Sequence, residues 1–351
     1  MPYKLLTFAL CLLLLACKKK IKEEPVSVPY QLKNGILVLN EGLFNQNNAT
    51  LGWFDLNAGT YNNQFFEEKN GRSLGDTGND LKRYGGKIYV VVNVSSTLEI
   101  LDAFTGKSLK QIPMIANGTP KQPRFVTFSG SKAYISCYDG YVDVLDTASL
   151  TINQRIQVGA NPEGLVVSNG KLFVANSGGL NYPNVDSTVS VIDLGSHTEL
   201  TRITVGKNPG DIAVDPSGDV YVISRGNYST IPSRMHRINA QTNTKEQSFT
   251  FDASSITPFN NQFLISSSSG GQSQVALFDT QNESILQSNF LNTSNIETLY
   301  ELYYHPSNSK IYCMDAKNYT VTGQIHIFSN TGTFERTLQV GLNPSKIIIY
   351  E

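Results

Sequence analysis

Three stretches of the chain decide its fold: IQVGANPEGLVV (residues 156–167), ITVGKNPGDIAV (203–214) and LQVGLNPSKIII (338–349). They share the pattern apolar-x-Val-Gly-x-Asn-Pro-x-x-apolar, and the prolines of the first two, Pro162 and Pro209, lie 47 residues apart. A period of this length is typical of an array of identical supersecondary units. The chain is therefore expected to repeat one structural unit from end to end.

Each unit contains segments with the composition of β-strands. After one Asn-Pro strand come KLFVAN (171–176), VSVIDL (189–194) and LTRITVG (200–206), which returns to the next Asn-Pro. These segments are rich in β-branched and aromatic residues and are separated by turn residues, a pattern that indicates antiparallel hairpins. Each unit is thus predicted to hold four strands.

An aspartate at the end of the third strand measures the period independently. The first four copies are 47, 44 and 47 residues apart, and Asn239 and Ser329 replace the aspartate in two divergent copies. Seven units fit between residue 35 and the end of the chain. Four strands in about 40–45 residues make one blade of a β-propeller. We predict an all-β fold, a seven-bladed β-propeller. The aspartates that mark the ends of the third strands are Asp55, Asp102, Asp146, Asp193 and Asp279.

The two ends of the repeat array complement each other. The first unit opens on GILVLNE (residues 35–41), a second-strand sequence, and the chain stops on NPSKIIIYE (343–351), a first-strand sequence. Pairing of residues 346–350 beside residues 35–40 would complete one blade and leave no exposed sheet edge. The ring is therefore expected to be closed by the C-terminal strand.

Composition agrees with this fold and excludes some partners. Hydrophobic residues make up 40% of the chain, and the 28 glycines suit a protein with many turns. The formal net charge of −1 leaves no electrostatic footprint for nucleic acid. No long apolar pattern with a 3.6-residue period argues for a helical domain.

The N-terminus resembles an export signal. Lys4 precedes the apolar residues 5–15, and Ala16 precedes Cys17, as in secretory signal peptides. The tetrad Leu-Leu-Ala-Cys that ends at Cys17 resembles the lipobox of bacterial lipoproteins, which implies cleavage before Cys17 and its lipidation. An ordinary signal with a chance cysteine is the alternative.

This interpretation divides the chain into three parts. Residues 1–16 form a lipoprotein signal peptide, residues 17–34 a lipidated cysteine with a polar tether, and residues 35–351 the propeller. The protein is then expected to be anchored by lipid to the outer membrane, on the cell surface or the periplasmic face.

A search for catalytic motifs favours a protein that is not an enzyme. No GxSxG, HExxH, P-loop or EF-hand pattern occurs, and no cofactor or metal is predicted. Propeller lactonases surround a central metal with Glu, Asn and Asp. Glu163, Asn208, Asp211 and Glu301 are candidates for such a role, but turn formation by Asn-Pro explains the repeated part of this set. A lactonase-like hydrolase is kept as the alternative.

The loops between second and third strands carry the predicted binding site. They vary in length, are rich in Asn, Tyr, Ser and Gly, and leave one face of the ring, which is typical of the working face of a repeat array. Tyrosine and asparagine suit the binding of a large polar ligand. Arg225 is expected to pair with a phosphate or carboxylate of the ligand. The predicted ligand-binding residues, of which the tyrosines are expected to be exposed, are Phe44, Asn45, Tyr138, Asn181, Tyr182, Arg225, Asn227, Tyr228 and Tyr319.

Whole blades resemble a known repeat. The segments NPEGLVVSNGKLFVANSGG (161–179) and STVSVIDLGSHTELTRITVG (187–206) are similar to the YVTN-type repeats of YncE-like seven-bladed propellers. This resemblance covers nearly all of residues 35–351. It implies the propeller fold but does not identify a ligand.

The first half resembles a narrower group, the lipoprotein propellers of Bacteroidetes that include surface cobalamin binders. The segments that carry this resemblance are residues 40–55, 70–81 and 85–102. It implies capture of cobalamin or another corrinoid for a TonB-dependent outer-membrane transporter. No histidine lies in the predicted binding loops, so a corrinoid would be held there without imidazole ligation. A propeller that binds only proteins is a further alternative.

Overall fold

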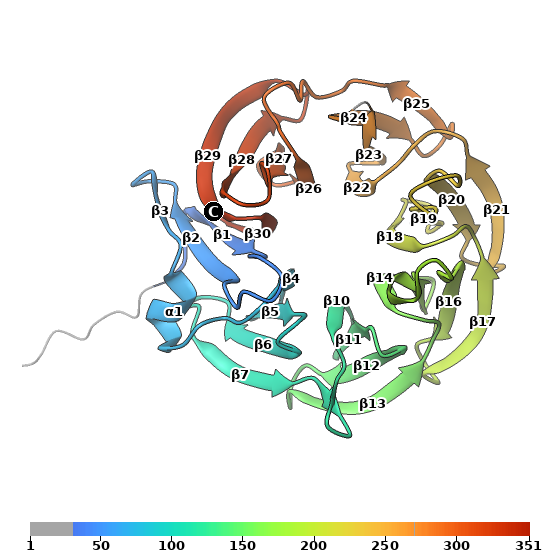
Figure 1. The fold of residues 1–351 in the computed structure, drawn as a ribbon, viewed down its shortest axis with the longest axis horizontal. Coiled ribbons are helices and arrows are strands. Elements are labelled where there is room, and N and C mark those ends of the chain that lie inside the picture. The colour runs from blue at the N-terminus through green and yellow to red at the C-terminus, as the bar shows by residue number, and fades with distance from the viewer. Residues whose placement is uncertain (1–30, 270) are drawn as a thin grey trace, which may run out of the picture. The chain divides into compact units, whose positions relative to one another are not determined.

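The computed structural model describes residues 31–269 and 271–351, and it shows seven four-stranded antiparallel sheets arranged around a central axis (Figure 1). From the innermost strand outward, the closing blade contains β30 (Pro344–Tyr350), β1 (Gly35–Asn40), β2 (Thr50–Asp55) and β3 (Thr60–Asn62). The next blade contains β4 (Gly78–Tyr84), β5 (Lys87–Val92), β6 (Thr97–Asp102) and β7 (Ser108–Pro113). The third contains β10 (Pro123–Ser129), β11 (Lys132–Cys137), β12 (Tyr141–Asp146) and β13 (Thr151–Gln157).

The remaining four blades follow the same order around the ring. The fourth contains β14 (Pro162–Ser168), β15 (Lys171–Asn176), β16 (Thr188–Asp193) and β17 (Thr198–Thr204). The fifth contains β18 (Pro209–Val214), β19 (Val220–Ser224), β20 (Arg234–Asn239) and β21 (Thr244–Phe249). The sixth contains β22 (Ser255–Phe259), β23 (Gln262–Ser269), β24 (Gln272–Asp279) and β25 (Ser284–Gln287). The seventh contains β26 (Leu299–His305), β27 (Lys310–Asp315), β28 (Thr322–Ser329) and β29 (Phe334–Leu342).

The predicted closure of the ring is confirmed. Strand β30 pairs antiparallel with β1, with Tyr350 opposite Gly35 and Lys346 opposite Leu39. The Tyr350 hydroxyl donates a hydrogen bond of 2.7 Å to the carbonyl of Ala103, which lies in the next blade. The last strand therefore joins the first blade and also fixes it to its neighbour.

The Val-Gly-x-Asn-Pro repeat forms the connection from one blade to the next. Gly159 lies against Asn176 so closely that a Cβ at Gly159 would be 2.4 Å from the Asn176 Cγ. Asn161 has a φ of 44°, in the left-handed region that asparagine tolerates better than most residues, and its side chain donates to the Tyr138 carbonyl at 2.9 Å. Pro162 then begins β14. The glycine, the asparagine and the proline of the motif thus each have a structural role.

The periodic aspartate is a turn former. Asp146 Oδ1 accepts hydrogen bonds from the backbone N–H groups of Ala148 and Ser149 at 3.0 and 2.8 Å. Short polar side chains commonly hold a turn in this way. Equivalent contacts to the following backbone are made by Asp55, Asp102, Asp193, Asn239 and Asp279.

Four short elements were not predicted. Helix α1 (Phe65–Asn70) lies between the closing blade and β4, a hairpin of β8 (Ile115–Ala116) and β9 (Thr119–Pro120) precedes β10, and the 3-10 helix η1 (Gly179–Asn181) follows β15. Each is too short to show a sequence period. No helix among the described residues is long and apolar enough to cross a membrane.

The predicted signal peptide, residues 1–16, and the lipidation site Cys17 lie outside the described residues. Of the predicted tether, residues 17–34, only the last four are described. Within these, Leu32 is buried, and its N–H donates to the Phe104 carbonyl at 2.7 Å.

Candidate functional site

The loops between second and third strands and the Asn-Pro connections lie on one face of the ring, which we call the loop face. The carbonyl of each Asn in the motif accepts a backbone hydrogen bond from the residue that follows the second strand of its blade. The three pairs are Ser177 to Asn161 at 3.2 Å, Arg225 to Asn208 at 2.9 Å, and Glu41 to Asn343 at 2.8 Å. This arrangement brings the variable loops to the end of the central channel.

Two kinds of position supply side chains there. One is the second residue of an innermost strand, which gives Arg124, Glu163 and Tyr300; the other is the residue directly after a second strand, which gives Glu41, Tyr138 and Arg225. We call these six residues the mouth cluster. They come from five different blades, so the cluster exists only in the assembled ring.

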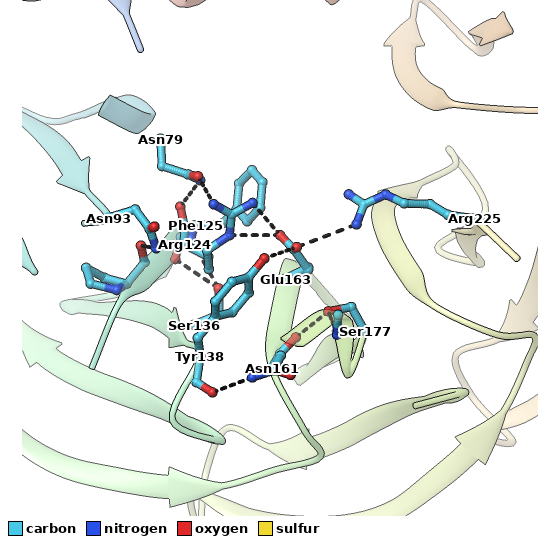
Figure 2. Close-up of polar contacts among 12 residues, drawn as sticks. Asn79, Asn93, Arg124, Phe125, Ser136, Tyr138, Asn161, Glu163, Ser177 and Arg225 are labelled. Carbon is cyan, nitrogen blue, oxygen red and sulfur yellow. Dashed lines mark hydrogen bonds and ion pairs between the residues drawn. The ribbon is translucent and has the colours of Figure 1, made fainter. Parts of the chain in front are cut away.

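Glu163 is the centre of the mouth cluster (Figure 2). Its side chain is buried, with 3% exposed, and accepts hydrogen bonds or ion pairs from Arg124 at 3.0 Å, from the Tyr138 hydroxyl, and from Arg225 at 3.5 Å. Burial alone would raise the pKa of Glu163, but the nearby Arg124 guanidinium and the other donors outweigh it, and the pKa lies below its usual value. Glu163 is therefore a fixed anion at neutral pH.

The Arg124 guanidinium contacts three neighbouring side chains. It donates to Asn79 as well as to Glu163, and its Cζ lies 4.7 Å from the ring centroid of Tyr138. A guanidinium over an aromatic face is stabilised by the ring quadrupole. The tyrosine and the arginine thus hold each other and Glu163 in one arrangement.

A second carboxylate lies across the mouth. The Tyr300 hydroxyl donates to Glu41, and burial raises the pKa of Glu41. Tyr319 stands edge-on to Tyr300, with ring centroids 5.9 Å apart. This links an exposed loop tyrosine to the fixed cluster.

A cavity of about 280 Å³, the chamber, opens among the innermost strands. It is lined by the third residues of several innermost strands, which include Asp80, Asp211, Glu301 and Lys346. Glu301 pairs with Lys346, and the Asp211 carboxylate accepts from the Ile256 N–H of the next blade at 2.7 Å. Burial raises the pKa of both Asp211 and Glu301.

The four residues considered for a lactonase-like metal are engaged separately. Glu163 is ion-paired in the mouth, Asp211 joins two blades, Glu301 pairs with Lys346, and Asn208 donates to the Tyr228 hydroxyl at 3.0 Å. Across residues 31–269 and 271–351, no group of three or more His, Cys, Asp or Glu is placed to hold a metal ion.

Half of the exposed large hydrophobic side chains lie on the loop face. Of the fourteen large hydrophobic side chains exposed in the described residues, seven lie in four loops of the loop face. Such residues are rarely grouped on a monomer without a binding role. We call this group the apolar rim; it consists of Phe44, Leu180, Tyr182, Tyr228, Ile231, Tyr319 and Val321.

The predicted site residues divide between the cluster, the rim and the loop backbones. Tyr138 and Arg225 belong to the mouth cluster, and the expectation that Tyr138 is exposed was wrong, because its ring is half-buried under Arg124. Tyr228 and Tyr319 belong to the apolar rim, and Tyr319 also contacts Tyr300 of the mouth cluster. Phe44 and Tyr182 belong to the exposed rim.

The three predicted asparagines lie in loops of the loop face, and the side chain of Asn227 shapes its own loop. Asn227 Oδ1 accepts the N–H groups of Ser229 and Ile231 at 3.1 and 2.7 Å, so its side chain builds its own loop. The Asn45 N–H donates to Asp76 at 3.1 Å, and Asn181 ends η1.

Glu41, Arg124 and Tyr300 were missed by the sequence analysis. A usable signal was present, because each is either the second residue of a first strand or the residue directly after a second strand. Reading these positions in every blade would have found them, but only once the strand boundaries were known to within one residue.

A further cavity of about 630 Å³, the side cavity, lies between the β19–β20 loop and the connection from β21 to β22. Arg225 and Tyr228 line it together with Ser229, Ile231, Pro232, Ser233, Asp252, Ala253, Ser254 and Ser268.

Comparisons with known proteins agree with the fold. The family described as "Domain of unknown function (DUF5074)" matches residues 34–343. No curated protein sequence matches the chain. Similar structures include a quinoprotein alcohol dehydrogenase-like protein from Bacteroides thetaiotaomicron, 15% identical over 91% of this chain and 78% of that one, with a TM-score of 0.68.

Two further structures are similar over most of the ring. Hydrazine synthase from Kuenenia stuttgartiensis is 15% identical over 74% of this chain and 85% of that one, with a TM-score of 0.60. The dihydro-heme d1 dehydrogenase NirN, in complex with DHE, is 12% identical over 90% of this chain and 75% of that one, with a TM-score of 0.58. At these identities the likeness shows a shared β-propeller fold and no shared ligand.

Proposed function

The chain belongs to the DUF5074 family, and we propose that it is a non-enzymatic binding protein whose loop face captures a large polar ligand with apolar surface. The observation that carries this proposal is the apolar rim around the mouth cluster. Aromatic side chains offer wide contact area at low entropic cost, and the charged groups inside the rim can orient polar parts of a ligand.

The ring favours binding because its site is preformed. The mouth cluster is held by contacts among five blades, so ordering it on binding costs little further entropy. A rigid site with an exposed, partly aromatic border suits a ligand larger than the chamber of about 280 Å³. The charged side chains of the mouth cluster are fixed in position, and we propose that they recognise polar groups of the ligand.

We propose a corrinoid such as cobalamin as the ligand, delivered to a TonB-dependent outer-membrane transporter by a lipoprotein anchored through Cys17. The ligand, the transporter and the anchor rest on the resemblance of residues 40–55, 70–81 and 85–102, and on the lipobox-like tetrad. The apolar rim is compatible with the flat, partly apolar surface of a corrin ring.

Calorimetry with cyanocobalamin and cobinamide tests the proposal on the full chain in mild detergent. We expect the wild type to give heat of binding, and we expect the affinity to fall at least about tenfold when Tyr182 and Tyr228 are both replaced by alanine. Phe104→Ala is the control, because Phe104 is as exposed as Tyr319 but lies in the β6–β7 turn, away from the loop face. No heat with either corrinoid at high micromolar concentration would refute the corrinoid, and unchanged affinity of the double variant would refute the loop face.

A further inference from the structure

Arg225 is held in place but poorly neutralised. Its backbone N–H donates to the Asn208 carbonyl at 2.9 Å, which fixes the start of the loop. Its side-chain contact with Glu163 is long, 3.5 Å from Nη1 to Oε1 (Figure 2). That same oxygen already accepts the Tyr138 hydroxyl, while Arg124 occupies the other oxygen.

The comparison with Arg124 makes the difference clear. The Arg124 side chain is 18% exposed and donates to both Asn79 and Glu163, whereas the Arg225 side chain is 32% exposed and has four N–H donors without a described acceptor. A guanidinium has five donors in a rigid fork that matches carboxylate and phosphate groups. Arg225 therefore retains the capacity to bind an anion.

Gly210 provides the surface on which the Arg225 guanidinium rests. A Cβ at Gly210 would lie 2.4 Å from Arg225 Cζ and 2.5 Å from its Nη2. Gly210 is the second residue of β18, the position that carries Arg124 in β10 and Glu163 in β14. The absence of a side chain at this position of β18 gives the guanidinium its place beside the mouth.

Arg225 is also one of the residues that line the side cavity. Tyr228, 72% exposed, forms part of its wall, and its hydroxyl accepts from Asn208 at 3.0 Å, which anchors the ring at one end. The carboxylate in the described lining is that of Asp252, which faces Arg234 at 3.7 Å and Ser233 at 3.4 Å. Beyond its long contact with Glu163, Arg225 therefore has donors available for an external anion.

We infer that the side cavity is a subsite for a carboxylate or phosphate group attached to an aromatic ring, with the anion on Arg225 and the ring against Tyr228. This inference rests on the proposed function and adds the anionic character of the part of the ligand that enters the side cavity. Fork-like pairing with a planar or tetrahedral anion is the strongest contact that the remaining donors of Arg225 can make.

Three small probes test the subsite directly on the full chain by calorimetry: phenyl phosphate, benzoate and benzyl alcohol. We expect the phosphate, the benzoate or both to bind at least about tenfold more tightly than the neutral alcohol. The tighter of the two anions identifies the group. Equal affinity for the alcohol and both anions would overturn the inference.

Two variants locate the anion. Arg225→Gln should lose at least about tenfold in anion affinity, and Gly210→Ala should reduce it also, because the added methyl group displaces the guanidinium. Arg202→Gln, which removes an equal charge on the outer strand β17, is the matched control and should leave affinity unchanged. Unchanged anion binding by a folded Arg225→Gln protein would exclude Arg225 as the anion-binding group.

The same variants separate this inference from the proposed function. Cyanocobalamin carries a phosphodiester in its nucleotide loop, whereas cobinamide lacks both the nucleotide and the phosphodiester. Binding of both corrinoids with no effect of Arg225→Gln, and no binding of the small anions, would leave the function standing and refute the subsite. Arg225-dependent binding of the anions, with no binding of either corrinoid, would keep the subsite and refute the corrinoid.

Discussion

Truncation of Tyr350 should open the ring. The side chain is 4% exposed, packs edge-on to Trp53 at 5.5 Å between centroids, and donates to the Ala103 carbonyl at 2.7 Å. Tyr350→Phe removes the hydrogen bond and leaves a buried acceptor, which costs about 1–3 kcal/mol of unfolding free energy. Tyr350→Ala also leaves a cavity, and large aromatic truncations cost about 3–5 kcal/mol.

The assay is urea-induced unfolding followed by tryptophan fluorescence. Trp53 is the chain's only tryptophan, and it lies in the closing blade, so its emission reports on the ring closure itself. The control is Tyr84→Phe, which removes a more exposed hydroxyl bonded to the Gly130 carbonyl at 2.6 Å and should cost about 1 kcal/mol or less. A Tyr350→Ala cost below about 1 kcal/mol, at unchanged denaturant dependence, would refute the role of this contact in closure.

Three further predictions concern the mouth, the N-terminus and acid stability. Glu163→Gln should cost about 3 kcal/mol in urea unfolding, because it leaves the mostly buried Arg124 without its anion; a cost below about 1 kcal/mol would contradict this. Labelled fatty acid should be incorporated by the wild type and not by the Cys17→Ser variant, and equal labelling of both would contradict lipidation. Burial acts to raise the pKa of Asp315, but donors that include His326 outweigh it and leave it low. The stability that Asp315 contributes is present above the ordinary carboxyl pKa of about 4 and is lost as the pH falls through the lower pKa of the folded state. The urea midpoint should therefore fall less on acidification in Asp315→Asn than in the wild type, and an equal fall in both proteins would contradict this prediction.

The fold could be predicted because each repeated residue has a local structural cause. Asn161 adopts a positive φ, Gly159 makes room for Asn176, and Asp146 forms a turn. The positive φ recurs at Asn208 and Asn343, and the side-chain turn recurs in other blades, so both leave a period in the sequence. The match between the two chain ends followed from the same period. Helix α1 escaped prediction because one and a half turns show no periodicity.

The site was predicted less well because it depends on contacts between blades. Tyr138 and Asn227 look alike in the sequence, as polar loop residues, yet one is half-buried under Arg124 and the other builds its own turn. Glu41 and Tyr300 are 259 residues apart and meet only through ring closure. Composition directed attention to the loops between second and third strands, but it could not show which of their side chains join the mouth cluster.

Because the mouth cluster spans five blades, ligand binding and ring closure should be coupled. A ligand that binds the folded ring and not the unfolded chain stabilises it by about 2.7 kcal/mol at one hundred times its dissociation constant. We therefore expect saturating ligand to raise the urea midpoint of the wild type. Tyr350 lies outside the mouth cluster, yet the apparent affinity of the Tyr350→Ala protein should fall in proportion to the fraction of molecules whose ring is closed. Leu200→Ala, exposed on the outer strand β17 of the fourth blade, is the control: it should bind with wild-type affinity and show the same ligand-induced rise in urea midpoint. A Tyr350→Ala protein that opens in the fluorescence assay yet binds with wild-type affinity would show that the loop face recognises its ligand without a closed ring.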